Sequence, residues 1–163
     1  MGATEKLADL IEQAAPLYLR RGRLQTVHQW LEAVPDQMIV GRPWLALYRG
    51  MILATQSQSQ AARLLLSQAR RAFAAAGDEV DQSRALNQLS RVAAFKGGYE
   101  ESLELNHEAF WRMPWADHDG RTQALREQAE LWVYLGSSVR DEIIQFLQHY
   151  EMAHLALSGR DGP

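Results

Sequence analysis

The sequence predicts an all-α fold, specifically an α–α superhelix (solenoid) of about four antiparallel helix pairs. Ala, Leu and Gln dominate the 163 residues, whereas the β-branched residues that favour strands are scarce. Small residues at Gly50, Ser90 and Ala129 are spaced by 40 and 39 positions. Each lies midway along an apolar-periodic segment that runs into a turn. A period near 40 residues built from helix–turn–helix units is typical of an α-solenoid.

The first pair is predicted from apolar residues that recur at helical spacing over residues 5–21. Pro16 interrupts this segment and is expected to kink or split the helix, because proline removes a backbone donor. Gly22 ends the helix, and its partner is expected over residues 24–34. Pro35 then closes the pair.

The second pair begins with a helix over residues 44–55, since Pro43 suits the first turn of a helix. The polar stretch 56–60 is expected to be a turn, because helical periodicity resumes directly after it. The second helix of this pair is predicted over residues 61–76, and Gly77 ends it.

The third pair consists of predicted helices over residues 79–96 and 99–113, separated by a Gly97–Gly98 stop. The fourth pair consists of predicted helices over residues 121–135 and 139–157. Asp117 or Asp119 is expected to cap the first of these.

Composition narrows the class of protein. The chain has no cysteine, which excludes disulfides, thiolate catalysis and cysteine-based zinc sites. Its net charge is −3 and its 17 basic residues are spread widely, so we expect no direct binding of nucleic acid. No apolar run approaches the ~18 residues of a membrane span, and no signal peptide is evident, which favours a cytoplasmic protein. We expect one domain over residues 5–157 and a disordered tail over residues 158–163.

The pairs fit the tetratricopeptide pattern, in which a first helix carries a small residue and a second helix carries alanine near its start. The alignment superimposes the second pair on the third at an offset of 40 residues. It places Gly50 on Ser90, Ala62 on Ser102, Leu66 on Asn106 and Ala69 on Ala109.

Four segments, taken in order, resemble one family. They read LRRGRL (residues 19–24), WLEAVPD (30–36), RPWLAL (42–47) and AFAAAGD (72–78). Together they are similar to the tetratricopeptide-like repeat domain of MalT-type transcriptional regulators of the LuxR superfamily. In that family an ATPase module precedes the repeat domain and a helix-turn-helix module follows it.

The resemblance implies that this chain is a sensor or interaction domain. It would bind a small-molecule effector or a protein partner in a concave groove and relay the binding to the flanking ATPase and DNA-binding modules, with self-association as a further possibility. We expect no cofactor and no catalysis. The alternative is a generic tetratricopeptide scaffold for protein–protein interaction. A sensor needs an enclosed apolar pocket with a few converging polar groups, whereas a scaffold needs an open groove.

The groove is expected to be lined by the first helices of successive pairs. Arginine and asparagine can bind carboxylate, phosphate or sugar hydroxyls, and tryptophan can stack on an apolar group. The alternative is an ordinary solvated helix face. The five tryptophans could also suggest carbohydrate binding, but most fall at packing positions. The predicted groove residues are Trp44, Arg84, Asn87, Arg91, Gln123, Arg126 and Glu130.

A metal site is the alternative to the groove. Glu104 with His107, and Glu151 with His154, form two Glu-x-x-His pairs of the kind found in di-iron helical bundles. The helix over residues 79–96 carries a glutamate only at its start, so the fourth carboxylate ligand is missing. No Gly-x-Ser-x-Gly elbow or phosphate-binding loop is present either. The sequence therefore favours a binding domain over an enzyme.

Overall fold

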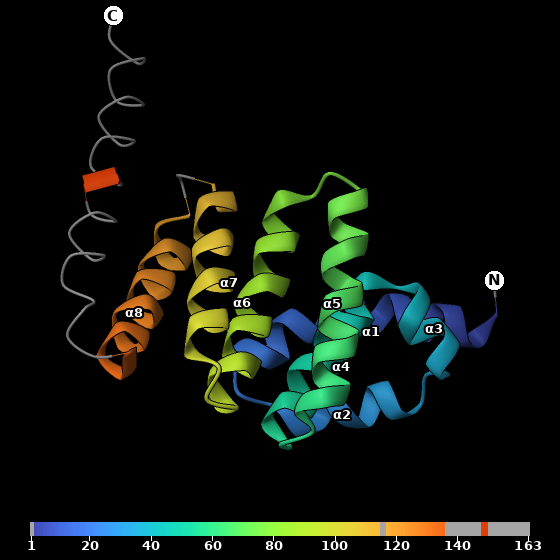
Figure 1. The fold of residues 1–163 in the computed structure, drawn as a ribbon. Coiled ribbons are helices and arrows are strands. Elements are labelled where there is room, and N and C mark those ends of the chain that lie inside the picture. The colour runs from blue at the N-terminus through green and yellow to red at the C-terminus, as the bar shows by residue number, and fades with distance from the viewer. Residues whose placement is uncertain (1, 115–116, 136–147, 150–163) are drawn as a thin grey trace, which may run out of the picture.

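The computed structural model describes residues 2–114, 117–135 and 148–149 (Figure 1). Within these residues the only regular secondary structure is helical, which confirms the all-α prediction. The predicted helix over residues 139–157 and the predicted tail fall outside the described residues, apart from residues 148–149. The helices are α1 (Ala3–Arg20), α2 (Leu24–Glu32), α3 (Asp36–Gly41), α4 (Pro43–Thr55), α5 (Ser59–Ala75), α6 (Glu79–Phe95), α7 (Tyr99–Arg112) and α8 (His118–Leu135).

Helices α4 to α8 pack in the order of the chain, each against the next (Figure 1). The contacts of α6 with α7 and of α4 with α5 are the most extensive. Short turns join the members of both pairs, and a short connection forces sequential helices to lie side by side. Helices α1, α2 and α3 lie at the N-terminal end of this row, and all three contact α4.

Two of the small residues lie at close helix contacts. A Cβ atom on Gly50 of α4 would lie 2.7 Å from Cγ of Leu66 on α5, so only glycine allows this approach. In α6, the Ser90 hydroxyl donates to the Ser102 carbonyl at 2.8 Å, and the Ser102 hydroxyl donates to the Ser90 carbonyl at 2.8 Å. At these positions α4 and α5 therefore meet through apolar contact, and α6 and α7 meet through hydrogen bonds.

The turns of these two hairpins share a left-handed residue. Gly97 has φ of 78° in the turn between α6 and α7. Ser57, which lies 40 residues earlier, has φ of 61° in the turn between α4 and α5. The left-handed region costs an L-residue about 1–2 kcal/mol but is freely open to glycine. Ser57 is the one non-glycine residue with positive φ in the described part of the chain.

The structure corrects three local predictions. Helix α1 is not split, because it continues through Pro16 while Ala15 and other residues of the same face stay fully packed. Helix α3 was not predicted; it buries Ile39, which is 1% exposed. Helix α8 begins at His118, three residues before the predicted start. Asp117 is its cap, since its Oδ1 accepts from the Gly120 amide at 2.9 Å.

Three apolar clusters form the interior, each shared by neighbouring helices. The first joins α1 to α4, the second joins α4 to α6, and the third joins α6 to α8. Within the described range, no helix combines the length and the apolar character needed to cross a bilayer. The largest fully buried side chains include Phe110, Ile11, Leu31, Ile39, Leu45, Leu47, Leu66, Leu86 and Gln128.

Candidate functional site

The predicted groove residues divide between two clefts. Arg91 and Glu130 line a cleft of about 620 Å³ between α6, α7 and α8, which we call the α8 cleft. Trp44 and Arg84 line a smaller cleft of about 360 Å³ between α1, α4 and α6, which we call the α1 cleft. The residues that line the α8 cleft are Ser90, Arg91, Ala94, Phe95, Tyr99, Ser102, Glu127, Glu130 and Leu131.

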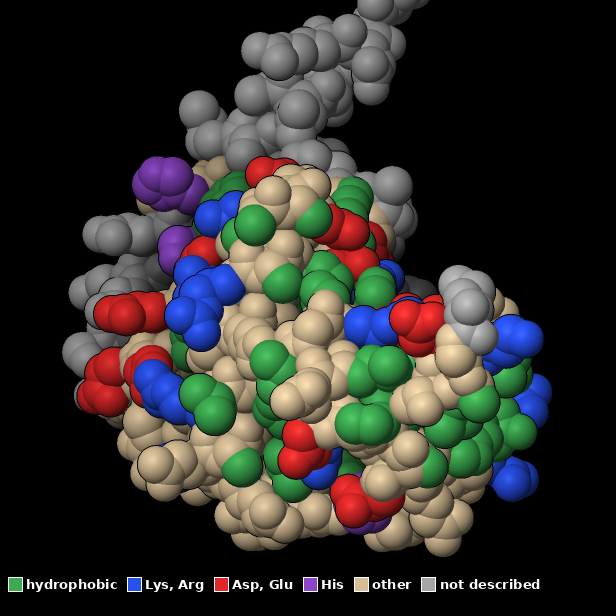
Figure 2. Space-filling view, turned by 90° about the vertical axis from the view of Figure 1, so that its right-hand side faces the viewer, with side chains coloured by type: hydrophobic (Ala, Val, Ile, Leu, Met, Phe, Trp, Pro, Cys, Tyr) green, Lys and Arg blue, Asp and Glu red, His purple; other side chains and the backbone are tan. Residues whose placement is uncertain are grey.

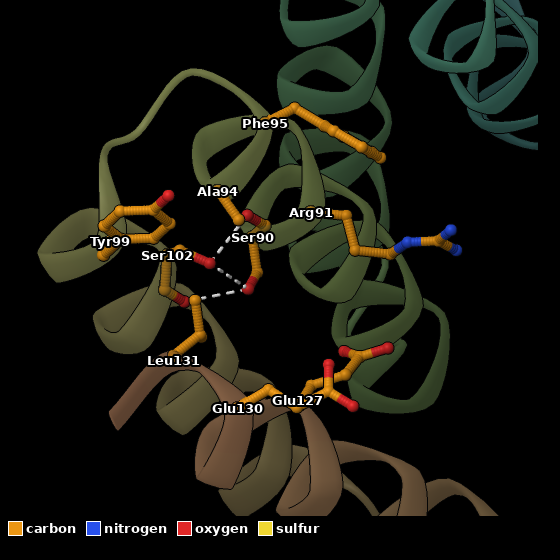
Figure 3. A pocket seen from close by; sticks show the side chains of 9 residues that line it. All are labelled: Ser90, Arg91, Ala94, Phe95, Tyr99, Ser102, Glu127, Glu130 and Leu131. Atoms are coloured by element: carbon orange, nitrogen blue, oxygen red, sulfur yellow. Dashed lines mark hydrogen bonds between the residues drawn. The ribbon is translucent and has the colours of Figure 1, made fainter. Parts of the chain in front are cut away.

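The two serines form the floor of the α8 cleft, where α6 and α7 approach each other (Figure 3). Each hydroxyl donates to the other residue's carbonyl, and the two Oγ atoms lie 2.9 Å apart. Ser90 is 2% exposed and Ser102 is 1% exposed. Because both donors are already used, the floor fixes the helices in place and leaves ligand contacts to the walls.

The walls of the α8 cleft carry charges of both signs. Arg91 of α6 and the carboxylates of Glu127 and Glu130 of α8 face the same opening (Figure 3). The Asn106 side chain of α7 donates from Nδ2 to Oε2 of Glu127 at 3.3 Å, which orients that carboxylate. Asn106 is fully buried, so this contact anchors Glu127 to the interior. The cleft can therefore bind an acidic and a basic group at the same time.

The edge of the α8 cleft is aromatic. Phe95 is 74% exposed, although phenylalanine is a residue that proteins usually bury. Tyr99, the first residue of α7, lies on the side of the same opening (Figure 3). Beneath them Leu131 of α8 is nearly buried. An exposed aromatic ring beside two kinds of charge is a common composition for an interaction surface.

The other predicted groove residues do not line either cleft. Asn87 is partly buried, and its Oδ1 has no hydrogen-bond partner among the described residues. Arg126 is exposed on α8. The side chain of Gln123 lies outside what the structure describes. Of the seven predicted groove residues, two therefore line the α8 cleft and two line the α1 cleft.

The α1 cleft joins the predicted Trp44 and Arg84. The guanidinium of Arg84 lies 5.6 Å from the centre of the Trp44 ring, within the range of a cation–π interaction. Arg84 also pairs with the nearby Asp81 carboxylate. Burial raises the pKa of Asp81, and the positive charge of Arg84 opposes that rise. The lining residues are Pro16, Leu19, Arg20, Trp44, Leu47, Tyr48, Met51, Arg84 and Gln88.

Sequence reasoning missed several lining residues, although helical spacing could have identified three of them. Tyr48 follows Trp44 by four positions, and Phe95 follows Arg91 by four positions, so each shares a helix face with a predicted residue. Glu127 precedes Glu130 by three positions on the same face. Residues from α1 had no such signal, because their position depends on how α1 packs.

The Glu-x-x-His alternative gains no support. Nε2 of His107 accepts a hydrogen bond from the Trp111 indole at 2.6 Å, so this nitrogen is already occupied. Burial lowers the pKa of His107. Across residues 2–114 and 117–135, no group of three or more histidine or acidic side chains is placed to hold a metal ion. Glu151 and His154 lie outside the described residues.

No protein-family model, curated protein or solved structure matches this chain. The resemblance to MalT-type regulators therefore stays a prediction, carried by the four sequence segments given above. What the α8 cleft and the α1 cleft can bind has to be argued from their own residues.

Proposed function

We propose that this chain is a tetratricopeptide-like binding domain, a solenoid of four antiparallel helix pairs, that holds a polypeptide segment of a protein partner in the α8 cleft. The observation that carries the proposal is the convergence of Arg91, Glu130 and the exposed Phe95 on one opening. Its function is binding and not catalysis.

The open shape of the α8 cleft favours a polypeptide over an enclosed small molecule. Arg91, Phe95 and Glu130 are all exposed, whereas a small-molecule pocket buries most of its ligand. A peptide can place an acidic side chain on Arg91, a basic one near Glu130 and an apolar one on Phe95. Aromatic and arginine residues are also those that contribute most to protein–protein affinity.

The repeat architecture is supported by the 40-residue equivalence of the hairpins. Gly50 and Ser90 both lie at close helix contacts, and Ala62 and Ser102, which align with each other, are both buried. In such repeats each unit contacts mainly its neighbours, and the first helices line a common binding surface. The α8 cleft uses two successive first helices, α6 and α8, of the proposed solenoid.

The cellular context follows from the family resemblance. We propose that the domain belongs to a cytoplasmic MalT-like regulator, whose ATPase and helix-turn-helix modules respond to occupancy of the cleft. Such a response requires that the partner bind one state of the regulator more tightly than the other. A generic interaction scaffold remains the alternative, and it would use the same cleft without this coupling.

The proposal is tested by selecting a phage-displayed random heptapeptide library on the purified domain. We expect enriched peptides that combine an acidic, a basic and an aromatic or aliphatic residue. Phe95→Ala should weaken binding of the synthesised peptide by about tenfold, because loss of an aromatic anchor commonly costs more than about 1 kcal/mol and tenfold corresponds to about 1.4 kcal/mol. Arg91→Ala should weaken it as well.

Leu64→Ala is the matched control. Leu64 of α5 is 67% exposed, close to the exposure of Phe95, but it does not line the α8 cleft. Its substitution should leave peptide affinity unchanged. Selected peptides that bind the Phe95→Ala protein as tightly as the wild type would contradict the proposal, and so would a selection that enriches nothing.

A further inference from the structure

The outer side of α1 exposes an apolar stripe. Leu10 is 62% exposed and Leu17 is 42% exposed, although leucine is among the residues that proteins usually bury. Neighbouring members of the stripe are three or four positions apart in the sequence, so they lie in one line along the helix. The members, which together we call the α1 face, are Lys6, Leu10, Ala14, Leu17 and the C-cap residue Arg21.

A recess between α1 and α2 adjoins the α1 face, and it is lined by Leu7, Leu10, Ile11, Ala14 and Trp30. Its volume of about 230 Å³ is below the roughly 300 Å³ at which small-molecule pockets begin. None of the lining residues is charged. Figure 2 looks at the molecule from this end and shows apolar side chains gathered on the right, with basic side chains at their outer edge. The recess therefore suits one apolar side chain of a partner better than a free ligand.

A basic residue lies at each end of the α1 face. Lys6 is one turn before Leu10, and Arg21 is one turn after Leu17. Both basic side chains are exposed, and neither forms an ion pair within the described part of the chain. At a rise of about 1.5 Å per residue, their positions are roughly 22 Å apart along the helix axis. The α1 face therefore has a positive charge at each end of an apolar centre.

The acidic residues of α1 do not neutralise these two charges. Asp9 and Glu12 are both bound by Arg42, whose Nη1 lies 2.6 Å from Oδ1 of Asp9 and 3.3 Å from Oε2 of Glu12. Glu5 accepts a hydrogen bond from the Gly2 amide at 3.1 Å, and helical spacing places Glu5 on another side of α1. The charge along the α1 face is therefore positive, which favours an acidic partner.

The position of the α1 face in the fold favours a helix as that partner. In a repeat array, the outer face of a terminal unit is usually polar, which keeps the array soluble. The first pair of the proposed solenoid, α1 and α2, instead exposes Leu10 and Leu17. Helices pack by fitting the side chains of one into the recesses of the other. The exposed leucines and the recess beside them together match this kind of contact.

We propose that the α1 face binds an amphipathic helix of a protein partner, one that carries an acidic residue at each end of its apolar stripe. The apolar residues of the partner pack on Leu10 and Leu17 and place one side chain in the recess. Its two carboxylates meet Lys6 and Arg21. Two exposed leucines offer too little apolar area to hold a lipid bilayer. The α8 cleft lies at the other end of the row of helices, so either site can fail without the other (Figure 1).

The probe is a synthetic helical peptide of about 20 residues, long enough to span both charges of the α1 face. It carries leucines along one face and a glutamate at each end of that face. Two matched peptides carry glutamine or lysine in place of the glutamates. We expect the glutamate peptide to bind about fivefold more tightly than the glutamine peptide at low salt, since exposed ion pairs are weak. Added salt should remove this difference.

Variants of the α1 face give the sharper test, with binding measured by NMR titration of the labelled chain. Leu10→Gln should weaken the glutamate peptide by about tenfold. Leu64→Gln is the matched control, because Leu64 of α5 is 67% exposed and lies outside the α1 face, and it should change nothing. The double variant Lys6→Glu with Arg21→Glu should reverse the preference, so that the lysine peptide binds more tightly than the glutamate peptide. Melting temperatures close to that of the wild type show that these variants are folded.

Three results of the peptide titrations would overturn the inference. They are equal binding of the glutamate and glutamine peptides at low salt, unchanged affinity in Leu10→Gln, and an unchanged preference in the double variant. Two further measurements test other occupants. Binding to vesicles of phosphatidylserine and phosphatidylcholine without binding of the peptide would assign the α1 face to a lipid surface. A dimer in sedimentation that Leu10→Gln converts to a monomer would assign it to a second copy of the chain, and either result would overturn the proposed partner.

Discussion

The hairpin of α4 and α5 and the hairpin of α6 and α7 both contain a close helix contact, but different interactions hold it. In the first, Gly50 allows α4 to approach Leu66, which is fully buried. In the second, Ser90 takes the place of the glycine, and Asn106 takes the place of the leucine. The first contact is held by apolar packing and the second by a pair of reciprocal serine hydrogen bonds.

Asn106 explains why the second hairpin departs from apolar packing. It is fully buried, its Nδ2 reaches Glu127 on α8, and its Oδ1 has no hydrogen-bond partner among the described residues. An unsatisfied buried polar atom is destabilising. The same side chain, however, orients a carboxylate that lines the α8 cleft. The contact between α4 and α5 is therefore the more stable arrangement, whereas α7 buries a partly unsatisfied amide that orients a carboxylate at the α8 cleft.

Exchanging the side chains at the equivalent positions 66 and 106 should change the free energy of unfolding the most. Leu66→Asn removes a fully buried side chain and buries an amide without a partner, so we expect a loss of about 3 kcal/mol or more. Asn106→Leu should leave stability unchanged or raise it by about 1 kcal/mol, because it removes the unsatisfied oxygen. Urea denaturation of both proteins measures the difference. Equal losses in the two variants would refute the contrast between the hairpins.

Substitutions of the small residues Gly50 and Ser90 should have the next largest effect on stability. Gly50→Ser places a Cβ atom 2.7 Å from Leu66 Cγ, and overpacking of this kind costs about 1–3 kcal/mol. Ser90→Gly removes two hydrogen-bonding contacts and adds a helical glycine, for an expected loss of about 1–2 kcal/mol. Chemical denaturation again gives both values. A stable Gly50→Ser protein would mean that α4 and α5 can separate without cost.

Substitutions in the two hairpin turns should change stability less, and in opposite directions. Ser57→Gly should stabilise the protein by up to about 1 kcal/mol, since it relieves a left-handed residue. Gly97→Ser at the equivalent turn should destabilise it by a similar amount. The melting temperatures of the two variants should therefore move in opposite directions. A lower melting temperature for Ser57→Gly would show that the serine side chain has a stabilising role of its own.

The smallest effect is expected for the ion pairs that link the two hairpins. Arg63 and Arg70 of α5 pair with Glu101 and Glu108 of α7. The hydrogen bond from Arg63 lowers the pKa of Glu101, so its contribution is present above the ordinary pKa of 4.5 and is lost as the pH falls through the lower folded-state value.

The Glu101 pair is half exposed and should contribute less than about 1 kcal/mol. The stability difference between the wild type and Glu101→Gln, measured from pH 7 to pH 3, should shrink toward acid. A difference that stays constant over this range would show that the pair contributes nothing through its charge.

Local features of the fold were predictable from the sequence, and long-range ones were not. Gly77, Gly97 and Pro43 mark helix ends through backbone chemistry that each residue carries alone. Helix α3 has only six residues, too few to show a period. The lining of the α1 cleft depends on how α1 packs against α4, which no repeat alignment contains. For the same reason Leu19 and Arg20 were not expected near Trp44.

The most direct test of the proposed binding function is an amide chemical-shift map of the labelled domain during titration with the selected heptapeptide. The proposed α8 cleft predicts the largest shifts at Arg91, Phe95, Tyr99 and Glu130, with little change around Leu64. Peptide-induced shifts that centre on α5, or that leave α6 and α8 unchanged, would contradict the proposed binding site.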